Sequence, residues 1–104
     1  MNETVDDLTV DYEDNGVLTV KELDKKVLTK GAWSTIMFKF QQWDDKKEAY
    51  GPFKYSIRRY QKRNGAYQAK SKFNISSDAQ AQQIIDALQG WMADSEALVD
   101  EADS

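Results

Sequence analysis

The fold is decided by residues 33–75, which read WSTIMFKFQQWDDKKEAYGPFKYSIRRYQKRNGAYQAKSKFNI. This block contains three runs that are typical of β-strands. From Trp33 to Trp43 the side chains alternate with a period of two, so that Ile36, Phe38 and Phe40 share one face, as a strand with one buried face requires. A shorter run at residues 25–30 precedes the block, and Gly31 allows the chain to turn between them. The sequence therefore predicts four antiparallel strands.

The turn around Asn64-Gly65 sets the register of the last two strands. A two-residue turn would place Ile57 opposite Lys72, which mixes an apolar face with a basic one. A three-residue loop at residues 63–65 places Ile57 opposite Ser71 and keeps the faces distinct, so we expect this loop, in the common form that ends with a left-handed glycine. The resulting core includes Phe38, Phe40, Phe53, Tyr55, Ile57, Phe73 and Ile75.

A C-terminal helix follows the strands. Ser77 and Gln80 have the spacing of a capping box, and Asp78 lies in the first turn, where the helix dipole favours an acid. Apolar residues then recur at helical spacing: Ala81, Ile84, Ile85, Leu88, Trp91 and Met92. We expect this stripe to cover the inner face of the sheet, with Trp91 and Met92 in the core or in a dimer contact.

The predicted fold class is α+β, a four-stranded curved antiparallel sheet followed by one amphipathic helix (ββββα). One helix over a small sheet buries little apolar surface, so we also expect a homodimer. Charge divides the chain into three parts. Residues 1–20 carry a net charge of −6, residues 21–73 carry +9 and residues 74–104 carry −7. We interpret residues 1–20 as a disordered acidic arm, residues 21–92 as the binding domain and residues 93–104 as an acidic tail.

Composition narrows the function. The chain has no Cys and no His, which argues against thiolate zinc sites and Cys- or His-based catalysis. The carboxylate pairs Asp6-Asp7 and Asp44-Asp45 lie in polar segments, where burial cannot shift a pKa toward catalysis. We therefore expect no enzymatic activity, no cofactor, no metal and no small-molecule substrate. Without a membrane-length apolar run, we expect a cytoplasmic protein that does not bind membranes and that associates with the nucleoid if it is bacterial.

Cations alternate with flat rings through residues 33–75. Ten of the fourteen Lys and Arg lie between Lys39 and Lys72. Single-stranded nucleic acid suits such a surface, because phosphates attract the cations and unpaired bases stack on the rings. The residues that we expect to hold phosphates are Lys39, Lys54, Arg58, Lys70 and Lys72, and those that we expect to stack on bases are Tyr60, Trp33 and Trp43. The plainer alternative is a solvated basic sheet in which either Trp packs into a dimer interface.

The run SIRRY at residues 56–60, the glycine-containing turn, the run KSKFNIS at residues 70–76 and the closing helix together resemble the single-stranded DNA-binding domain of the transcriptional positive cofactor four family. The resemblance covers about residues 25–92. It implies a homodimer whose β-ribbons form a basic, aromatic-lined channel, with Arg58, Tyr60, Lys70 and Lys72 at matching positions. The chain departs from that pattern at Phe73-Asn74 and in the long loop at residues 44–52. It is also similar to the repeats of Pur-alpha type proteins.

These observations predict largely sequence-independent binding of single-stranded DNA, in transcription regulation, replication or repair. Two alternatives stay open: binding of RNA by the same fold, and a protein-interaction module that uses the aromatic sheet against an acidic partner. The acidic ends are either solubilising tails or segments that fold back over the basic surface.

Overall fold

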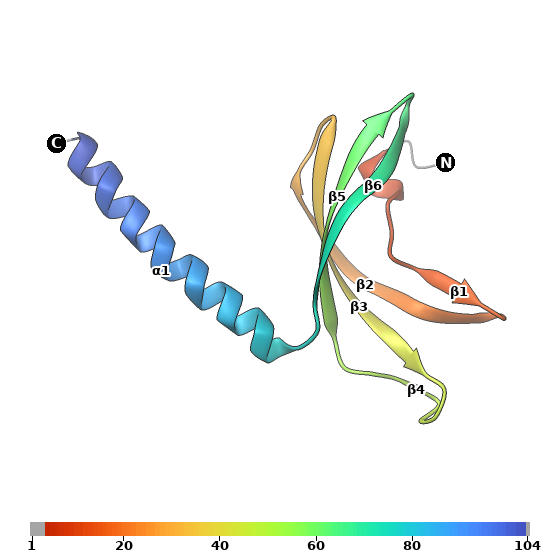
Figure 1. Ribbon diagram of the computed structural model, residues 1–104. Helices are drawn as coiled ribbons and strands as arrows, with labels where there is room; N and C mark the ends of the chain where they lie inside the picture. The colour runs from red at the N-terminus through yellow and green to blue at the C-terminus, as the bar shows by residue number, and fades with distance from the viewer. Residues whose placement is uncertain (1–3, 104) are drawn as a thin grey trace.

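The computed structural model describes residues 4–103, with side chains as far as Ser95. It is an α+β fold, in which a curled antiparallel sheet is followed by one long helix (Figure 1), as the sequence predicts. The elements are η1 (Val5–Asp7), β1 (Tyr12–Asp14), β2 (Val17–Thr29), β3 (Trp33–Asp44), β4 (Ala49–Tyr50), β5 (Lys54–Arg63), β6 (Ala66–Ile75) and α1 (Asp78–Asp103). None of the helices within residues 4–103 combines the length and the apolarity that crossing a bilayer would need.

The sheet is larger than the four strands expected. Its order is β1-β2-β3-β5-β6, and the short β4 pairs with the end of β3. The first long strand, β2, begins at Val17 rather than at residue 25. Asn15 and Gly16 both have positive φ, at 52° and 81°, which is the backbone of a tight two-residue hairpin turn. This turn adds β1 to the sheet.

Pairing between β3 and β5 defines two faces. Ser34 lies opposite Tyr60, Ile36 opposite Arg58 and Phe38 opposite Ser56. Directly opposed residues of an antiparallel pair point to the same side of the sheet. We call this side, which also carries Phe40, the inner face. The outer face carries the alternate residues: Trp33, Thr35, Met37, Lys39, Gln41 and Trp43 from β3, and Tyr55, Ile57, Arg59 and Gln61 from β5.

The predicted core is therefore correct for β3 and wrong for most of the later strands. Ile36, Phe38 and Phe40 are buried, whereas Tyr55 and Ile57 lie on the opposite face. Phe53 and Phe73 are exposed, and Ile75 is buried where β6 meets the helix. The error arises because both alternating sets of β5 contain large side chains, so that its own pattern does not say which set faces the core.

The N-terminal arm covers the inner face, in contrast to the disorder expected of it. Val5, Leu8 and Val10 are buried in one cluster with the inner-face residues of β3 and with Tyr60. The Nζ of Lys25 donates hydrogen bonds of 2.8–3.0 Å to the carbonyl oxygens of residues 5, 6 and 8. The acids between residues 4 and 14 stay exposed, while three apolar side chains supply the cover that the sheet needs.

The β5–β6 turn has two residues, so the predicted three-residue loop at residues 63–65 is wrong. Asn64 and Gly65 have φ of 53° and 80°, and Arg63 pairs with Ala66. The register shifts between Tyr60, which pairs with Ala69, and Arg59, which pairs with Ser71, so that Lys70 has no partner. A straight ladder from this turn would place the apolar Ile57 opposite the basic Lys72. The β-bulge places Ile57 opposite Phe73 instead, so that two apolar residues are paired.

The helix begins where its capping residues predict. The Gln80 N–H donates to the Ser77 hydroxyl at 3.2 Å, and the Gln80 side chain accepts from the Ser76 N–H at 2.9 Å. The prediction that its stripe covers the inner face is wrong, because the arm occupies that face and α1 projects from the other side (Figure 1). Ile85, Leu88, Trp91 and Met92 are all exposed. The segment expected to be a tail continues the helix to Asp103.

Candidate nucleic-acid interface

The eight residues predicted to bind nucleic acid do not share one surface. The outer face holds Trp33, Lys39 and Trp43, while the inner side of the ladder holds Lys54, Arg58, Tyr60 and Lys72. Lys70 is the extra residue of the bulge in β6. The single cationic face expected from the sequence is therefore divided by the sheet.

Tyr60 is a core residue and not a stacking platform. Only 5 % of its surface is exposed, and its ring packs in the cluster that contains Leu8 and Phe38. Burial raises the pKa of its hydroxyl, and the nearby Arg58 guanidinium opposes that rise. A ring enclosed in this way cannot receive a base, so the predicted stacking role of Tyr60 is wrong.

The inner-face cations lie beside the acidic arm. Arg58 is opposite Lys72 in the ladder, and both line a hollow of about 360 Å³ together with Asp11. The Arg58 Nε donates to the Ser56 hydroxyl at 3.2 Å, and the Lys54 Nζ donates to the Gln42 side-chain oxygen at 2.7 Å. These partners are neutral, so the bonds hold the side chains in place without cancelling their charge. The arm occupies part of the inner face, which leaves less of this face open to an extended polymer.

The outer face carries three pairs of a cation and a ring. The Arg59 guanidinium lies 4.6 Å from the Trp33 ring centroid, and the Lys39 Nζ lies 4.1 Å from that of Phe53. At the other end of β3, the Lys21 Nζ lies 5.2 Å from the ring centroid of Tyr50. Such distances allow the ring faces to attract the cations. We call this set, together with Trp43, the cation–ring row: Lys21, Trp33, Lys39, Trp43, Tyr50, Phe53 and Arg59.

Local structure fixes the ring of Trp43. Its Nε1–H donates to the Asp45 carboxylate at 2.8 Å, and its ring meets that of Tyr50 edge-on, with centroids 5.1 Å apart and planes at 74°. The short strand β4 places Tyr50 opposite Trp43, and the Tyr50 hydroxyl donates to the Leu18 carbonyl oxygen at 2.8 Å. The long loop after β3 thus holds two rings at one end of the row.

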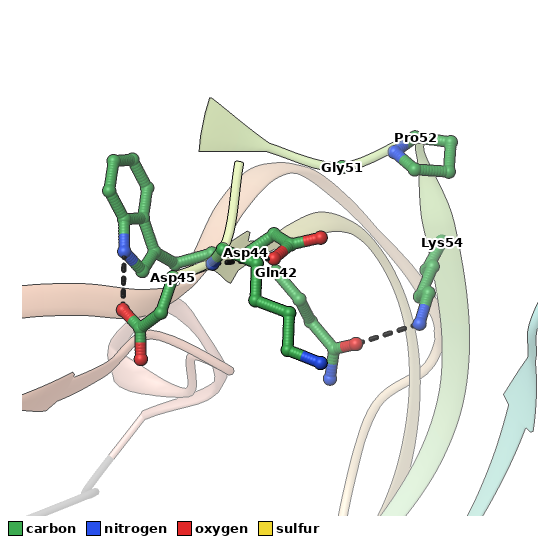
Figure 2. A pocket seen from close by; sticks show the side chains of 8 residues that line it. Gln42, Asp44, Asp45, Gly51, Pro52 and Lys54 are labelled. Carbon is green, nitrogen blue, oxygen red and sulfur yellow. Dashed lines mark hydrogen bonds between the residues drawn. The ribbon is translucent and has the colours of Figure 1, made fainter. Parts of the chain in front are cut away.

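A hollow of about 540 Å³ adjoins Trp43 at this end of the sheet (Figure 2). Its lining combines both signs of charge, with Asp44 and Asp45 on one side and Lys46 and Lys54 among the other residues. Figure 2 shows the indole N–H directed at Asp45, while Lys54 is directed at Gln42. Because its lining carries both signs of charge, this hollow does not form an anion site. It lies at the end of the cation–ring row.

Charged and apolar side chains both lie on the outer face. One row of paired residues runs from Lys26 on β2 through Met37 and Ile57 to Phe73 on β6. The neighbouring rows carry Lys39 on β3 and Arg59 on β5. The outer face therefore has an apolar row that begins at Met37 and ends at Phe73, with a cation on each side of it.

Four members of the cation–ring row were absent from the predicted site: Lys21, Tyr50, Phe53 and Arg59. Arg59 follows Arg58 directly, and only the β3–β5 register shows that it, and not Arg58, shares a face with Trp33. Phe53 was assigned to the core. The alternation of side chains along β3 correctly predicted that Trp33, Lys39 and Trp43 lie on one face.

Within the described residues, no group of three or more acids could hold a metal ion. Comparisons with protein-family models, with curated proteins and with solved structures found no match to this chain. The resemblance to the positive cofactor four family thus remains a prediction from sequence motifs.

Proposed function

We propose that this protein binds single-stranded nucleic acid along the cation–ring row of its outer face. The observation that carries the proposal is the placement of three cation–ring pairs on one face, with the side chains of β3 partly exposed between them. From Trp33 to Trp43 the row follows ten residue steps of β3, or roughly 33 Å at the usual rise of a strand. A flexible strand can follow such a length.

Each class of side chain has a part in this binding. Trp33, Trp43 and Phe53 offer ring faces to unpaired bases, at about 1–3 kcal/mol per stacked base. Lys21, Lys39 and Arg59 hold phosphates, for which they leave the ring faces that they now contact. Duplex DNA binds more weakly, because its bases are paired and stacked with one another. The ring and phosphate contacts carry no sequence information, so the binding is largely sequence-independent.

Tryptophan emission during titration with oligo-dT tests the proposal. We expect quenching on binding and an affinity that falls with salt, at a slope of about −2 in log affinity against log salt for three phosphate contacts. Single-stranded RNA and duplex DNA of matched sequence form the other arms of the experiment. An unchanged emission with every nucleic acid would contradict the proposal and favour an acidic protein segment as the ligand.

A pair of double variants locates the site. Lys39→Glu with Arg59→Glu reverses two charges of the outer face, and we expect it to weaken oligo-dT binding at least tenfold. Lys70→Glu with Lys72→Glu changes the net charge equally but alters the bulge and the inner face, and we expect it to bind within about threefold of the parent. Equal losses in both variants would indicate a general charge effect. Loss in the control variant alone would mean that the inner face is the site.

A further inference from the structure

We propose that the hollow of about 360 Å³ on the inner face binds a phosphomonoester, the group found in a nucleoside monophosphate and at the phosphorylated end of a strand. This hollow lies on the other side of the sheet from the cation–ring row. The inference therefore goes beyond the proposed function, which does not depend on it. The lining of the hollow joins two cations of the β5–β6 ladder to side chains of the arm, β1, β2 and β3.

Arg58 and Lys72 provide the positive charge of the hollow. They lie directly opposite one another in the ladder, and both belong to the lining. Like charges at directly opposed positions of an antiparallel pair are destabilising. An anion that contacts both side chains would replace this repulsion with two attractive contacts. A phosphomonoester carries a charge of about −1.5 to −2 at pH 7 and has several acceptor oxygens, so it matches a guanidinium and an ammonium together.

The buried Ser56 orients two of the donors in this lining. Its hydroxyl accepts a hydrogen bond of 3.2 Å from the Arg58 Nε and donates one of 2.8 Å to Oδ1 of Asn74. Since the Asn74 oxygen faces Ser56, the NH2 group of this amide remains as a donor. The Nε bond likewise leaves N–H groups on the Nη nitrogens of Arg58. Ser56 has no exposed surface, so the two side chains are held in place before a ligand arrives.

Gln42 adds a donor of the same kind. The Lys54 Nζ donates to its side-chain oxygen at 2.7 Å (Figure 2), and an ammonium group can only donate. The NH2 group of Gln42 is therefore left to donate, and Gln42 lines this hollow as well as the one beside Trp43. Two cations and two amides thus supply hydrogen-bond donors to one site.

One carboxylate opposes these cations, that of Asp11 on the arm. Its Oδ1 accepts the Glu22 N–H at 2.6 Å, and the hydroxyl of Thr9 donates to the Glu22 side chain at 2.7 Å. These bonds hold the arm against β2, with Asp11 at the wall of the hollow. Two cations and one acid give the lining a net charge of +1. The site therefore attracts an anion, and Asp11 weakens that attraction.

The remainder of the hollow suits an organic group joined to the phosphate. Tyr12, Val20 and Gln42 are paired in one row across β1, β2 and β3, and Val10 and Phe40 complete the apolar part of the lining. The side chain of Tyr12 is 61 % exposed, so a flat base can lie against its ring. The volume of about 360 Å³ is within the range of small-molecule sites, and a bare phosphate would fill only part of it.

Calorimetric titration of the full chain with thymidine 5′-monophosphate at low salt tests the site. We expect saturable binding, with shifts in the side-chain NMR signals of the Arg58 Nε–H and the Asn74 NH2 group. Thymidine, which lacks the phosphate, should bind about tenfold more weakly or less. Absence of binding by the monophosphate, or equal binding of thymidine, would overturn the proposal.

Three variants locate the site. Lys72→Gln removes one of its cations and should weaken binding of the monophosphate about tenfold. Lys70→Gln makes the same change of charge at the bulge, outside the lining, and should bind within about threefold of the parent. Asp11→Asn keeps an oxygen for the Glu22 N–H while removing the opposing charge, so it should bind about threefold more tightly. Equal losses in the two lysine variants, or weaker binding by Asp11→Asn, would contradict the assigned site.

A pair of strands separates the two sources of the phosphate. Oligo-dT with a 5′-phosphate differs from oligo-dT with a 5′-hydroxyl only at that end. Tighter binding of the phosphorylated strand by about threefold, lost in Lys72→Gln, would assign the site to strand ends. Equal binding of the two strands, with the monophosphate still bound, would assign it to a free nucleotide. The strand with the 5′-hydroxyl should bind Lys72→Gln as it binds the parent, which distinguishes this site from the cation–ring row.

Discussion

The hydroxyl of Tyr55 donates a 2.7 Å hydrogen bond to Oδ1 of Asp78 and so joins the outer face of β5 to the first turn of α1. The carboxylate raises the pKa of the Tyr55 hydroxyl, chiefly through this bond. The direction that α1 takes from the sheet is set here and at Ile75.

Tyr55→Phe removes the bond and keeps the ring. We expect the free energy of unfolding at pH 7 to fall by about 0.5–1 kcal/mol, at the lower end for a hydrogen bond because water reaches this pair. Urea denaturation gives the value. Tyr12→Phe, at an exposed tyrosine, is the matched control and should change the stability by less than half as much. A larger loss in the control would contradict the assigned contact.

Because the hydroxyl of Tyr60 is buried, the stability of the folded protein should fall at alkaline pH. Its folded pKa is raised above the unfolded value of about 10 by burial, so its contribution is complete below pH 10 and is lost as the pH rises through the folded pKa. Absorbance titration should show two tyrosinates that form later than the others in the parent, those of Tyr55 and Tyr60, and only that of Tyr55 in Tyr60→Phe. The variant should also lose less stability between neutral pH and pH 11 than the parent does.

Leu8 tests whether the arm belongs to the core. Its side chain is 1 % exposed, and we expect Leu8→Ala to reduce the free energy of unfolding by about 2–5 kcal/mol, as truncations in a packed core do. Leu28→Ala makes the same truncation at an exposed position of β2 and should cost less than about 1 kcal/mol. If the two variants unfold at the same urea concentration, the arm does not pack as described.

The turn between β5 and β6 depends on Gly65. Its φ of 80° is unfavourable for any residue with a Cβ, so Gly65→Ala should cost about 1–2 kcal/mol even though no atom lies within 4 Å of the added carbon. Gly51→Ala is the control, since that glycine has no positive φ and its Cβ would make only an ordinary contact at 3.7 Å. Equal thermal midpoints for the two variants would argue against the two-residue turn.

Local patterns predicted the parts of the fold that depend on local physics. The alternation of β3 identified Ile36, Phe38 and Phe40 as core, and the spacing of Ser77 and Gln80 identified the helix start. The faces of β5 required its register against β3, which is set across the loop at residues 45–53. Burial of Leu8 could not be predicted from an acidic segment, because it depends on an inner face that the helix leaves uncovered.

Local patterns in the sequence also predicted only part of the candidate site. Trp33, Lys39 and Trp43 fall on one face by alternation alone, and the structure keeps them there. We predicted that Arg58 and Tyr60 bind nucleic acid because this cation and this ring are two positions apart in the chain, and so share a face of the strand. The ladder turns both toward the core side and presents Arg59 to Trp33 instead.

The β-bulge at Lys70 makes β6 one residue longer than a regular ladder against β5 would need. The pairing of residues 66–69 starts from the tight turn, and Ser71 resumes the pairing opposite Arg59 after the extra residue. Deletion of Lys70 would join Ala69 directly to Ser71 and leave these pairs as they are, so that Phe73 would stay opposite Ile57 in a ladder without the bulge. Homologues of this chain that lack position 70 should therefore keep Lys72 and Phe73 on the faces that they occupy here.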